Sequence, residues 1–309
     1  MRKDAAMTLT RRRFATLGAA GLITGFAPFR AAMAQSTIGS FTLTSLSDGN
    51  LTLPASMTLE HVPADELAAV MAKYGLGDVL TPPCNVTLLQ AGDRNILFDV
   101  GAGTEFMSSA GFLVDALADA GLDPQDITDV AFTHAHPDHL WGVVDDFDDL
   151  LFPNARFMIG QAEWDYWTDA DTVNTIDDGR TTFAVGAARR LERIAENITF
   201  FNDGEEILPG VAARATYGHT PGHMSFELRQ GNDAMMILGD CIGNHHIAFE
   251  HPAWQAGSDQ NLELGAETRV ALLDQLAHDQ MPILGFHLMG NGIGRVERAG
   301  DTYRFVQDA

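Results

Sequence analysis

Four side chains that can bind a metal ion lie within six residues, His134-Ala135-His136-Pro137-Asp138-His139. Three imidazoles and a carboxylate held this close together are costly unless a cation compensates them. Neutral imidazole and carboxylate are the ligands that zinc and similar divalent ions take. His134 and His136 are two apart and can turn toward one ion, whereas the adjacent Asp138 and His139 diverge and suit a second ion. The segment therefore predicts a centre of two metals.

The elements that must position these ligands are strands that end in loops. Residues 127–133, just before the segment, are apolar and β-branched, which is typical of a strand. Pro137 should prevent a continuing helix, so we expect all four ligands on a loop. Four ligands do not complete two coordination shells. Three further candidates each follow a strand-like run, where loops gather at one edge of a sheet: His219, Asp240 and His287.

This order of ligands resembles the metallo-β-lactamase superfamily, which carries His-x-His-x-Asp-His, then Gly-His-Thr-Pro-Gly-His, an Asp and a final His. The second motif is matched by residues 218–223, within which His223 is expected to be a hydrogen-bonding partner. The resemblance implies two divalent metal ions, zinc first, with manganese, iron or cobalt as alternatives. It also implies one site made by His134, His136 and His219, a second made by Asp138, His139 and His287, and Asp240 as the bridge between them.

The rest of the chain interleaves strand and helix patterns. Strands are predicted at 41–46, 51–53, 86–90, 95–100, 156–159, 198–201, 211–216, 224–229 and 234–238, and helices at 112–120, 161–168, 182–196 and 262–278. Turns are expected at Asp48-Gly49 and Gly92-Asp93, and Gly121 is expected to end a helix. The resemblance implies the fold class, an α+β four-layer αββα metallo-β-lactamase sandwich.

Four further segments look like methyl parathion hydrolase and its relatives, a group similar to quorum-quenching lactonases: 41–49, 98–103, 152–155, and 292–295 with 303–306. This branch implies hydrolysis of neutral phosphotriesters, aryl esters or lactones. It also implies an aromatic substrate pocket at Phe106, Trp167 and Phe183, although each residue could equally pack in the core or on a helix face. His245 and His246 either contact substrate or face solvent.

The mechanism that the resemblance implies uses a hydroxide shared by the two metals, which attacks a carbonyl carbon or phosphorus while one metal polarises the oxygen. Asp138 and Asp240 are the expected catalytic carboxylates. Asp138 would orient the hydroxide or take a proton, and Asp240 would bridge the ions. Asp99 and Thr133 are expected to support the ligand histidines from behind. The bulky Trp141 stands where the superfamily usually has a small residue, so it is expected to reshape the pocket.

Three alternatives use the same ligands. An acyl-homoserine lactone lactonase differs only in substrate. A β-lactamase would suit an exported protein, but a bridging Asp240 is atypical of those enzymes. A non-catalytic metal-binding protein would not need seven ligands.

The N-terminal segment resembles a twin-arginine export signal. Thr10-Arg11-Arg12-Arg13-Phe14 precedes a Gly/Ala-rich apolar run, and Ala32-Met33-Ala34 offers a cleavage site. The apolar run is short for a membrane anchor, which needs about twenty residues. We therefore predict a signal peptide at residues 1–34, a hydrolase domain at 35–309, no stable membrane insertion after processing, and a periplasmic or secreted protein.

Composition narrows the class of partner. A net charge of −23 disfavours nucleic acid and would repel anionic substrates at long range, so a small neutral or apolar substrate is expected. A hydrophobic content of 46% suffices for one sizeable core. Cys84 and Cys241 leave a disulfide open in an oxidising compartment, with packing beside the metals as the alternative for Cys241. A homodimer is also left open.

Overall fold

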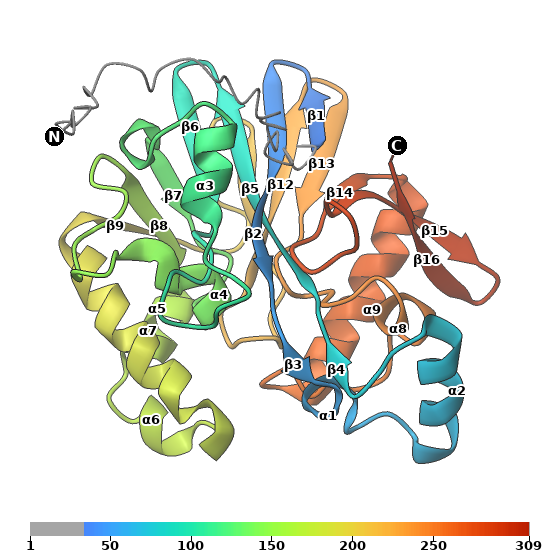
Figure 1. Ribbon diagram of the computed structural model, residues 1–309. Helices are drawn as coiled ribbons and strands as arrows, with labels where there is room; N and C mark the ends of the chain where they lie inside the picture. The colour runs from blue at the N-terminus through green and yellow to red at the C-terminus, as the bar shows by residue number, and fades with distance from the viewer. Residues whose placement is uncertain (1–33, 309) are drawn as a thin grey trace, which may run out of the picture. The chain divides into compact units, whose positions relative to one another are not determined.

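The computed structural model describes residues 34–308. The predicted export signal lies outside this range except for Ala34, which begins the first strand. Within these residues, two seven-stranded sheets form the centre (Figure 1). The first sheet has, in spatial order, β1 (Ala34–Ile38), β2 (Phe41–Asn50), β5 (Pro83–Ala91), β6 (Arg94–Phe98), β7 (Asp129–Ala131), β8 (Arg156–Gly160) and β9 (Ile198–Phe201).

The second sheet follows the chain in order: β10 (Glu206–Leu208), β11 (Val211–Ala215), β12 (Met224–Gln230), β13 (Asp233–Ile237), β14 (Pro282–Leu284), β15 (Ile293–Ala299) and β16 (Thr302–Gln307). Strands β6 to β9 are mutually parallel, as are β13 and β14, and the other neighbours are antiparallel. A small ribbon of β3 (Leu53–Pro54) and β4 (Val79–Leu80) stands apart.

Helices cover the outer face of each sheet, so four layers result (Figure 1). On the side of the first sheet lie α3 (Leu113–Asp119), α4 (Pro137–Leu140), α5 (Gln161–Thr168), α6 (Thr172–Thr175) and α7 (Thr181–Ile194). On the side of the second lie α8 (Ile247–Glu250) and α9 (Leu262–Asp279), while α1 (Ala55–Leu59) and α2 (Ala64–Tyr74) connect the two strands of the small ribbon.

Central strands are apolar on both faces because each face is covered. On β6, Ile96 and Phe98 belong to the core that includes residues of both sheets, whereas Leu97 belongs to the core shared with α3 and α7. On β13, Ile237 faces the first of these cores and Met236 packs with residues of α9. Side chains alternate along a strand, so continuous apolar runs supply two buried faces. The predicted αββα sandwich is confirmed.

Most predicted elements are present, and three expectations are wrong. Asp48-Gly49 is no turn, because both residues lie in β2, where the register with β5 shifts between Ser47 and Asn50. Residues 51–53 are not a strand, since β3 begins at Leu53. Pro137 does not keep Asp138 and His139 on a loop. It occupies the first position of α4, where proline is tolerated because its missing N–H needs no partner.

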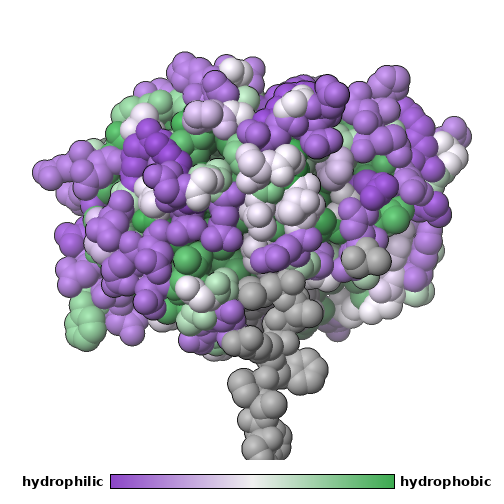
Figure 2. All heavy atoms as spheres, turned by 90° about the horizontal axis from the view of Figure 1, so that it is seen from above, coloured by the Kyte–Doolittle hydropathy of each residue, from purple (hydrophilic) through white to green (hydrophobic). Residues whose placement is uncertain are grey.

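β1 and α2 were not assigned from the sequence. β1 is short and mostly polar, whereas α2 carries Leu67, Val70, Met71 and Tyr74 at helical spacing, a signal that could have identified it. Of the helices between residues 34 and 308, none combines the length and apolar character needed to span a membrane. The face shown in Figure 2 is mostly hydrophilic, with only small apolar patches between polar side chains. The long helix α9 and the central strands therefore bury their apolar residues inside the layers.

Candidate metal centre

The structure brings all seven predicted ligands to one place and divides them into two groups. Ligand atoms within each group lie no more than 4.8 Å apart, and every member is buried. The groups are His134, His136 and His219, and Asp138, His139, Asp240 and His287. His134 and His136 follow β7, His219 follows β11, Asp240 follows β13, and His287 follows β14. Strands from both sheets therefore deliver the site.

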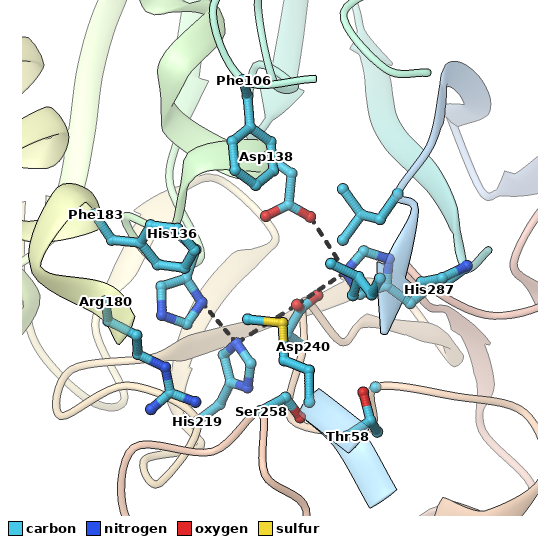
Figure 3. A pocket seen from close by; sticks show the side chains of 15 residues that line it. Thr58, Phe106, His136, Asp138, Arg180, Phe183, His219, Asp240, Ser258 and His287 are labelled. Atoms are coloured by element: carbon cyan, nitrogen blue, oxygen red, sulfur yellow. Dashed lines mark hydrogen bonds and ion pairs between the residues drawn. The ribbon is translucent and has the colours of Figure 1, made fainter. Parts of the chain in front are cut away.

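The three histidines of the first group point ring nitrogens at one another. His136 Nδ1 lies 3.1 Å from His134 Nε2 and 2.9 Å from His219 Nε2 (Figure 3). Three imidazole lone pairs cannot all be satisfied by the hydrogens available between them, whereas one cation satisfies all three. Burial comes first among the causes that hold the pKa of His134 and of His136 well below its usual value, so both rings are neutral, as metal ligands must be.

Asp240 lies between the two groups. Its Oδ2 is 3.1 Å from His287 Nε2, 3.5 Å from His219 Nε2 and 4.0 Å from His134 Nε2, while Oδ1 is 3.3 Å from His139 Nε2. Only this carboxylate among the described residues faces histidines of both groups. Within residues 34–308, three buried atoms here have no hydrogen-bond partner: Asp138 Oδ2, His139 Nε2 and Asp240 Oδ1. Orphaned buried ligand atoms fit a pair of cations.

Four of the five ligand rings are oriented by an oxygen atom on the far side. Asp99 and Thr133 take this position: Asp99 Oδ2 lies 2.8 Å from His139 Nδ1, and Thr133 Oγ1 lies 3.0 Å from His134 Nδ1. Thr133 also donates from its hydroxyl and its backbone N–H to Asp99, at 2.8 Å each. An oxygen accepting the far N–H fixes the tautomer, so the other nitrogen is free for a metal.

Two orienting partners escaped the sequence analysis. Asp259 Oδ1 lies 3.2 Å from His219 Nδ1, and the backbone oxygen of Pro83 lies 2.7 Å from His287 Nδ1. Arg269 donates to the second oxygen of Asp259 at 3.2 Å. The buried Asp259-Arg269 pair carries no recognisable motif, and a backbone carbonyl leaves no signal in a sequence.

His223 is the hydrogen-bonding partner that the sequence predicts. Its Nδ1 lies 2.8 Å from Thr216 Oγ1, and its Nε2 accepts from the backbone N–H of Asp240 at 2.9 Å. Gly239 makes this contact possible, because it has φ +58° and a Cβ there would come within 2.6 Å of His223 Nε2. His223 therefore holds the bridging carboxylate in place through its backbone.

Glu163 is a second feature that the sequence did not reveal. It is 0% exposed, and its two oxygens accept four hydrogen bonds. Oε1 accepts from the N–H of Ala135 at 2.9 Å and from Trp167 Nε1 at 2.6 Å. Oε2 accepts from the hydroxyl of Thr220 at 2.7 Å and from the N–H of Gly222 at 3.0 Å. One carboxylate on α5 thus ties the loop of His134 and His136 to the loop of His219.

A pocket opens onto the ligands, and the predicted substrate residues divide around it. Phe106 and Phe183 line it together with His136, Asp138, His219, Asp240 and His287 (Figure 3). Trp167 does not line it: this side chain is 1% exposed, its ring lies edge-on to His136 at 5.7 Å, and it donates to Glu163. The indole therefore packs behind a ligand rather than contacting substrate.

His245 and His246 also lie outside the pocket lining. His246 accepts from the N–H of Ile247 as the cap of α8, and its ring packs 5.2 Å from Tyr74 on α2. Burial lowers the pKa of His246 to about 4. Lining residues that the sequence did not indicate include Leu51, Leu53, Met57, Thr58, Arg180 and Ser258.

Trp141 acts on the pocket through Phe106. The two rings meet edge-on at 5.5 Å. The guanidinium of Arg190 on α7 lies over the indole of Trp141, 4.1 Å from its ring centroid. Gly186 accommodates the indole, because a Cβ at this position would come within 2.2 Å of it. Cys84 and Cys241 are both buried and free. Cys241 packs beside the centre and donates to the backbone oxygen of Leu238 at 3.2 Å.

Comparison with known proteins agrees with this geometry. A family model described as the metallo-beta-lactamase superfamily matches residues 80–276. An N-acyl homoserine lactonase of Bacillus sp. is 23% identical over 231 residues, covering 68% of this chain and 82% of that protein. The solved structure of AidC, a dizinc quorum-quenching lactonase, has a TM-score of 0.83 and 26% identity, covering 90% of this chain and 97% of that one.

A further solved structure, the hydrolase AbOPH, has a TM-score of 0.83 at 24% identity, covers 90% of this chain and 98% of its own, and shares the fold. These relatives and the two ligand groups confirm the predicted fold and the prediction of a metal-dependent hydrolase with two divalent ions. The matched region includes the two ligand loops, Asp240 and most of α9. This chain belongs to the metallo-β-lactamase superfamily.

Proposed function

We propose that this protein is a dinuclear metallo-hydrolase that opens lactone rings, with zinc as the resident metal and N-acyl lactones as the substrate class. The observation that carries the proposal is Asp240, placed between two buried ligand groups at the floor of a partly apolar pocket. Relatives described as an N-acyl homoserine lactonase and a dizinc quorum-quenching lactonase support the choice of substrate and metal.

His134, His136 and His219 would hold one ion, Asp138, His139 and His287 the other, and Asp240 both. When bound, two such ions lower the pKa of water and polarise a carbonyl oxygen. Burial opposes ionisation of Asp240, yet His287 and His139 hold the pKa of its carboxyl well below its usual value. Asp240 therefore remains a carboxylate that can serve both ligand groups.

Other residues of the pocket would hold the substrate and move the proton. Asp138 lines the pocket and supplies a carboxylate that can orient the attacking water or accept its proton. Phe106 and Phe183 meet edge-on at 6.0 Å and form an apolar wall of the pocket, which Leu51 and Leu53 also line. This wall suits the hydrocarbon part of a small molecule whose reacting ester is neutral.

A second candidate activity is hydrolysis of aryl esters and phosphotriesters at the same centre. The aromatic pair Phe106 and Phe183 favours it, since flat leaving groups pack on aromatic rings. A β-lactamase is a weaker candidate, because a bridging carboxylate such as Asp240 is atypical of those enzymes.

A substrate panel with metal-loaded protein tests the proposal. N-hexanoyl homoserine lactone, 4-nitrophenyl acetate, methyl paraoxon and nitrocefin are compared before and after chelation, and after zinc is restored. We expect the lactone to have the highest kcat/KM, all activity to disappear on chelation, and zinc to restore it. Nitrocefin turnover above lactone turnover, or lactone turnover that survives complete metal removal, would overturn the proposal.

A further inference from the structure

Arg180 is a cation in the substrate pocket that the proposed reaction does not use. It precedes α7 as the cap residue of that helix and lines the same pocket as His136, His219 and Phe183. Figure 3 shows its guanidinium away from Phe106, on the same side of the pocket as His219. A charged side chain placed among apolar and metal-binding groups is a candidate for substrate recognition.

Among the described residues, the guanidinium has one hydrogen-bond acceptor and no ion-pair partner. Its terminal nitrogen donates to the backbone oxygen of Gly257 at 2.6 Å. No carboxylate between residues 34 and 308 comes within 4.0 Å of it, whereas Arg189, Arg190 and Arg269 each have such a carboxylate. Arginine carries five N–H donors, so donors remain available to a bound molecule.

Two acidic residues around Arg180, Asp177 and Asp259, are engaged elsewhere. Asp177 Oδ1 accepts from the backbone N–H of Gly179 at 2.9 Å, within the turn before α7. Asp259 accepts from Arg269 and orients His219. Neither carboxylate can move to Arg180 without releasing the contact that it makes, which for Asp259 is the one that orients His219. The positive charge therefore stays exposed to the pocket.

The pocket also has polar lining besides Arg180. Thr58 of α1 and Ser258 line it, and Gly257, which accepts from Arg180, donates to the backbone oxygen of Thr58 at 3.2 Å (Figure 3). The two hydroxyls offer further donors for oxygen atoms within the same pocket as the ligands and Phe106. A molecule that fills the pocket meets metals, an apolar wall and a donor set.

We infer that Arg180 is a specificity-determining residue that binds a carboxylate carried by the substrate at a distance from the reacting ester. The inference deepens the proposed function and rests on it for the reacting bond. Guanidinium and carboxylate form two parallel hydrogen bonds, and such charge-assisted bonds are about twice as strong as neutral ones. The net charge of −23 acts on approaching anions at long range and is screened by salt within about 8 Å at physiological ionic strength. Contact with Arg180 is not screened in this way.

The test uses sets of three N-acyl homoserine lactones whose acyl chain ends in a carboxylate, in its methyl ester or in a methyl group. The three members of a set have the same acyl length, and the length differs from set to set. For the wild type at its best length, we expect kcat/KM for the carboxylate to exceed that for the methyl ester by about tenfold, or about 1.4 kcal/mol. In Arg180→Gln, the ratio should fall to about one. Turnover of the methyl-terminated lactone by the wild type reports separately on the proposed function.

Arg193→Gln is the matched control. Arg193 lies on the same helix and bonds to the backbone oxygen of Asp148 at 2.7 Å, away from the pocket lining, so its loss changes the net charge equally. It should keep the tenfold ratio. Arg180→Lys keeps the charge and loses the bidentate geometry, so it should give an intermediate ratio. This variant serves as the test if Arg180→Gln fails to fold.

Binding decides the inference even where no lactone is turned over. The ring-opened forms of the carboxylate and methyl-ester compounds are titrated calorimetrically into zinc-loaded wild type and Arg180→Gln. A tenfold lower Kd for the carboxylate in the wild type, lost in the variant, supports the role of Arg180. Equal Kd values in the wild type, or a preference that survives Arg180→Gln, would overturn it.

Discussion

At the scale of single residues, the centre separates ligands from residues that shape the pocket. Asp240 faces both ligand groups, whereas Phe183 packs 5.8 Å from His136 and lines the pocket. Substitutions of these two residues are therefore expected to have different effects on metal content and on substrate preference. Asp240→Ala should lower kcat/KM for lactones by at least about a hundredfold and reduce bound metal, because both ions lose a ligand.

Phe183→Ala should leave two metals bound and change the ranking of substrates by acyl length, because it removes part of the apolar wall. Elemental analysis of each purified variant, beside kcat/KM for lactones of increasing length, measures both effects. Equal metal loss in the two variants would contradict this division of roles.

Asp48 is a buried carboxylate that holds backbone rather than metal. It is 0% exposed and accepts from the N–H groups of Ala102 at 2.8 Å, Gly111 at 3.1 Å and Leu113 at 2.8 Å. Asp48→Ala should leave three buried donors unpaired and lower the free energy of unfolding by about 1–3 kcal/mol. Denaturant titration measures the change. The exposed Asp119→Ala should change it by less than about 0.5 kcal/mol, and a similarly small change in Asp48→Ala would refute the argument.

The metal ligands could be predicted from the sequence because their side chains are their own signal. Four lie within six residues, and the others follow strand-like runs. Trp167 shows the limit at this scale: an aromatic residue on α5 has the same spacing whether it faces a pocket or packs behind His136. Arg180, Asp259 and Glu163 were missed because their partners lie far away in sequence and form only in the folded chain.

At the scale of elements, α5 and the two ligand loops behave as one unit. Glu163 bonds to Ala135 in one loop and to Thr220 and Gly222 in the other. Glu163→Gln replaces an acceptor oxygen by a donor and should weaken the site of His134, His136 and His219, because both loops lose an anchor. We expect the affinity for one of the two ions to fall by about 10- to 100-fold.

Chelator competition followed by elemental analysis measures this loss. The expected stoichiometry falls from two metals to one at a chelator concentration that leaves the wild type loaded. Glu192→Gln, an exposed change on α7, is the control and should keep both metals. A Glu163→Gln protein that loses both ions together, or neither, would show that the carboxylate does not act on the three-histidine site.

Element boundaries reveal what pattern alone can establish. The strands at 95–98 and 234–237 were predictable because apolar residues occupy both faces, and the strand at 224–229 because apolar and polar residues alternate along it. The short helix α4 was not, since one turn that begins at Pro137 has no periodicity to detect. The turn expected at Asp48-Gly49 was wrong because Asp48 turns inward to bind backbone instead of capping a hairpin.

At the scale of the whole molecule, export is a proposal that rests on the N-terminal sequence. The predicted signal lies outside the described residues, which begin at Ala34. We propose that the protein is carried folded through the twin-arginine route and processed beside Ala34. Replacement of both Arg11 and Arg12 by lysine should keep the protein in the cytoplasm at its unprocessed length. Cell fractionation and N-terminal sequencing measure this, and normal processing of the double variant would exclude the route.

Each ligand group combines residues from the two sheets: the segment 134–139 follows β7 of the first, and His219, Asp240 and His287 follow strands of the second. A bound ion is thus a cross-link between halves of the polypeptide. No ribosome-bound fragment that stops short of His287 can offer both complete sites, so capture of the second ion must come late in synthesis. Binding only to the finished sandwich adds its own free energy to folding. Removal of metal should consequently weaken the packing between the two sheets before it destabilises either sheet.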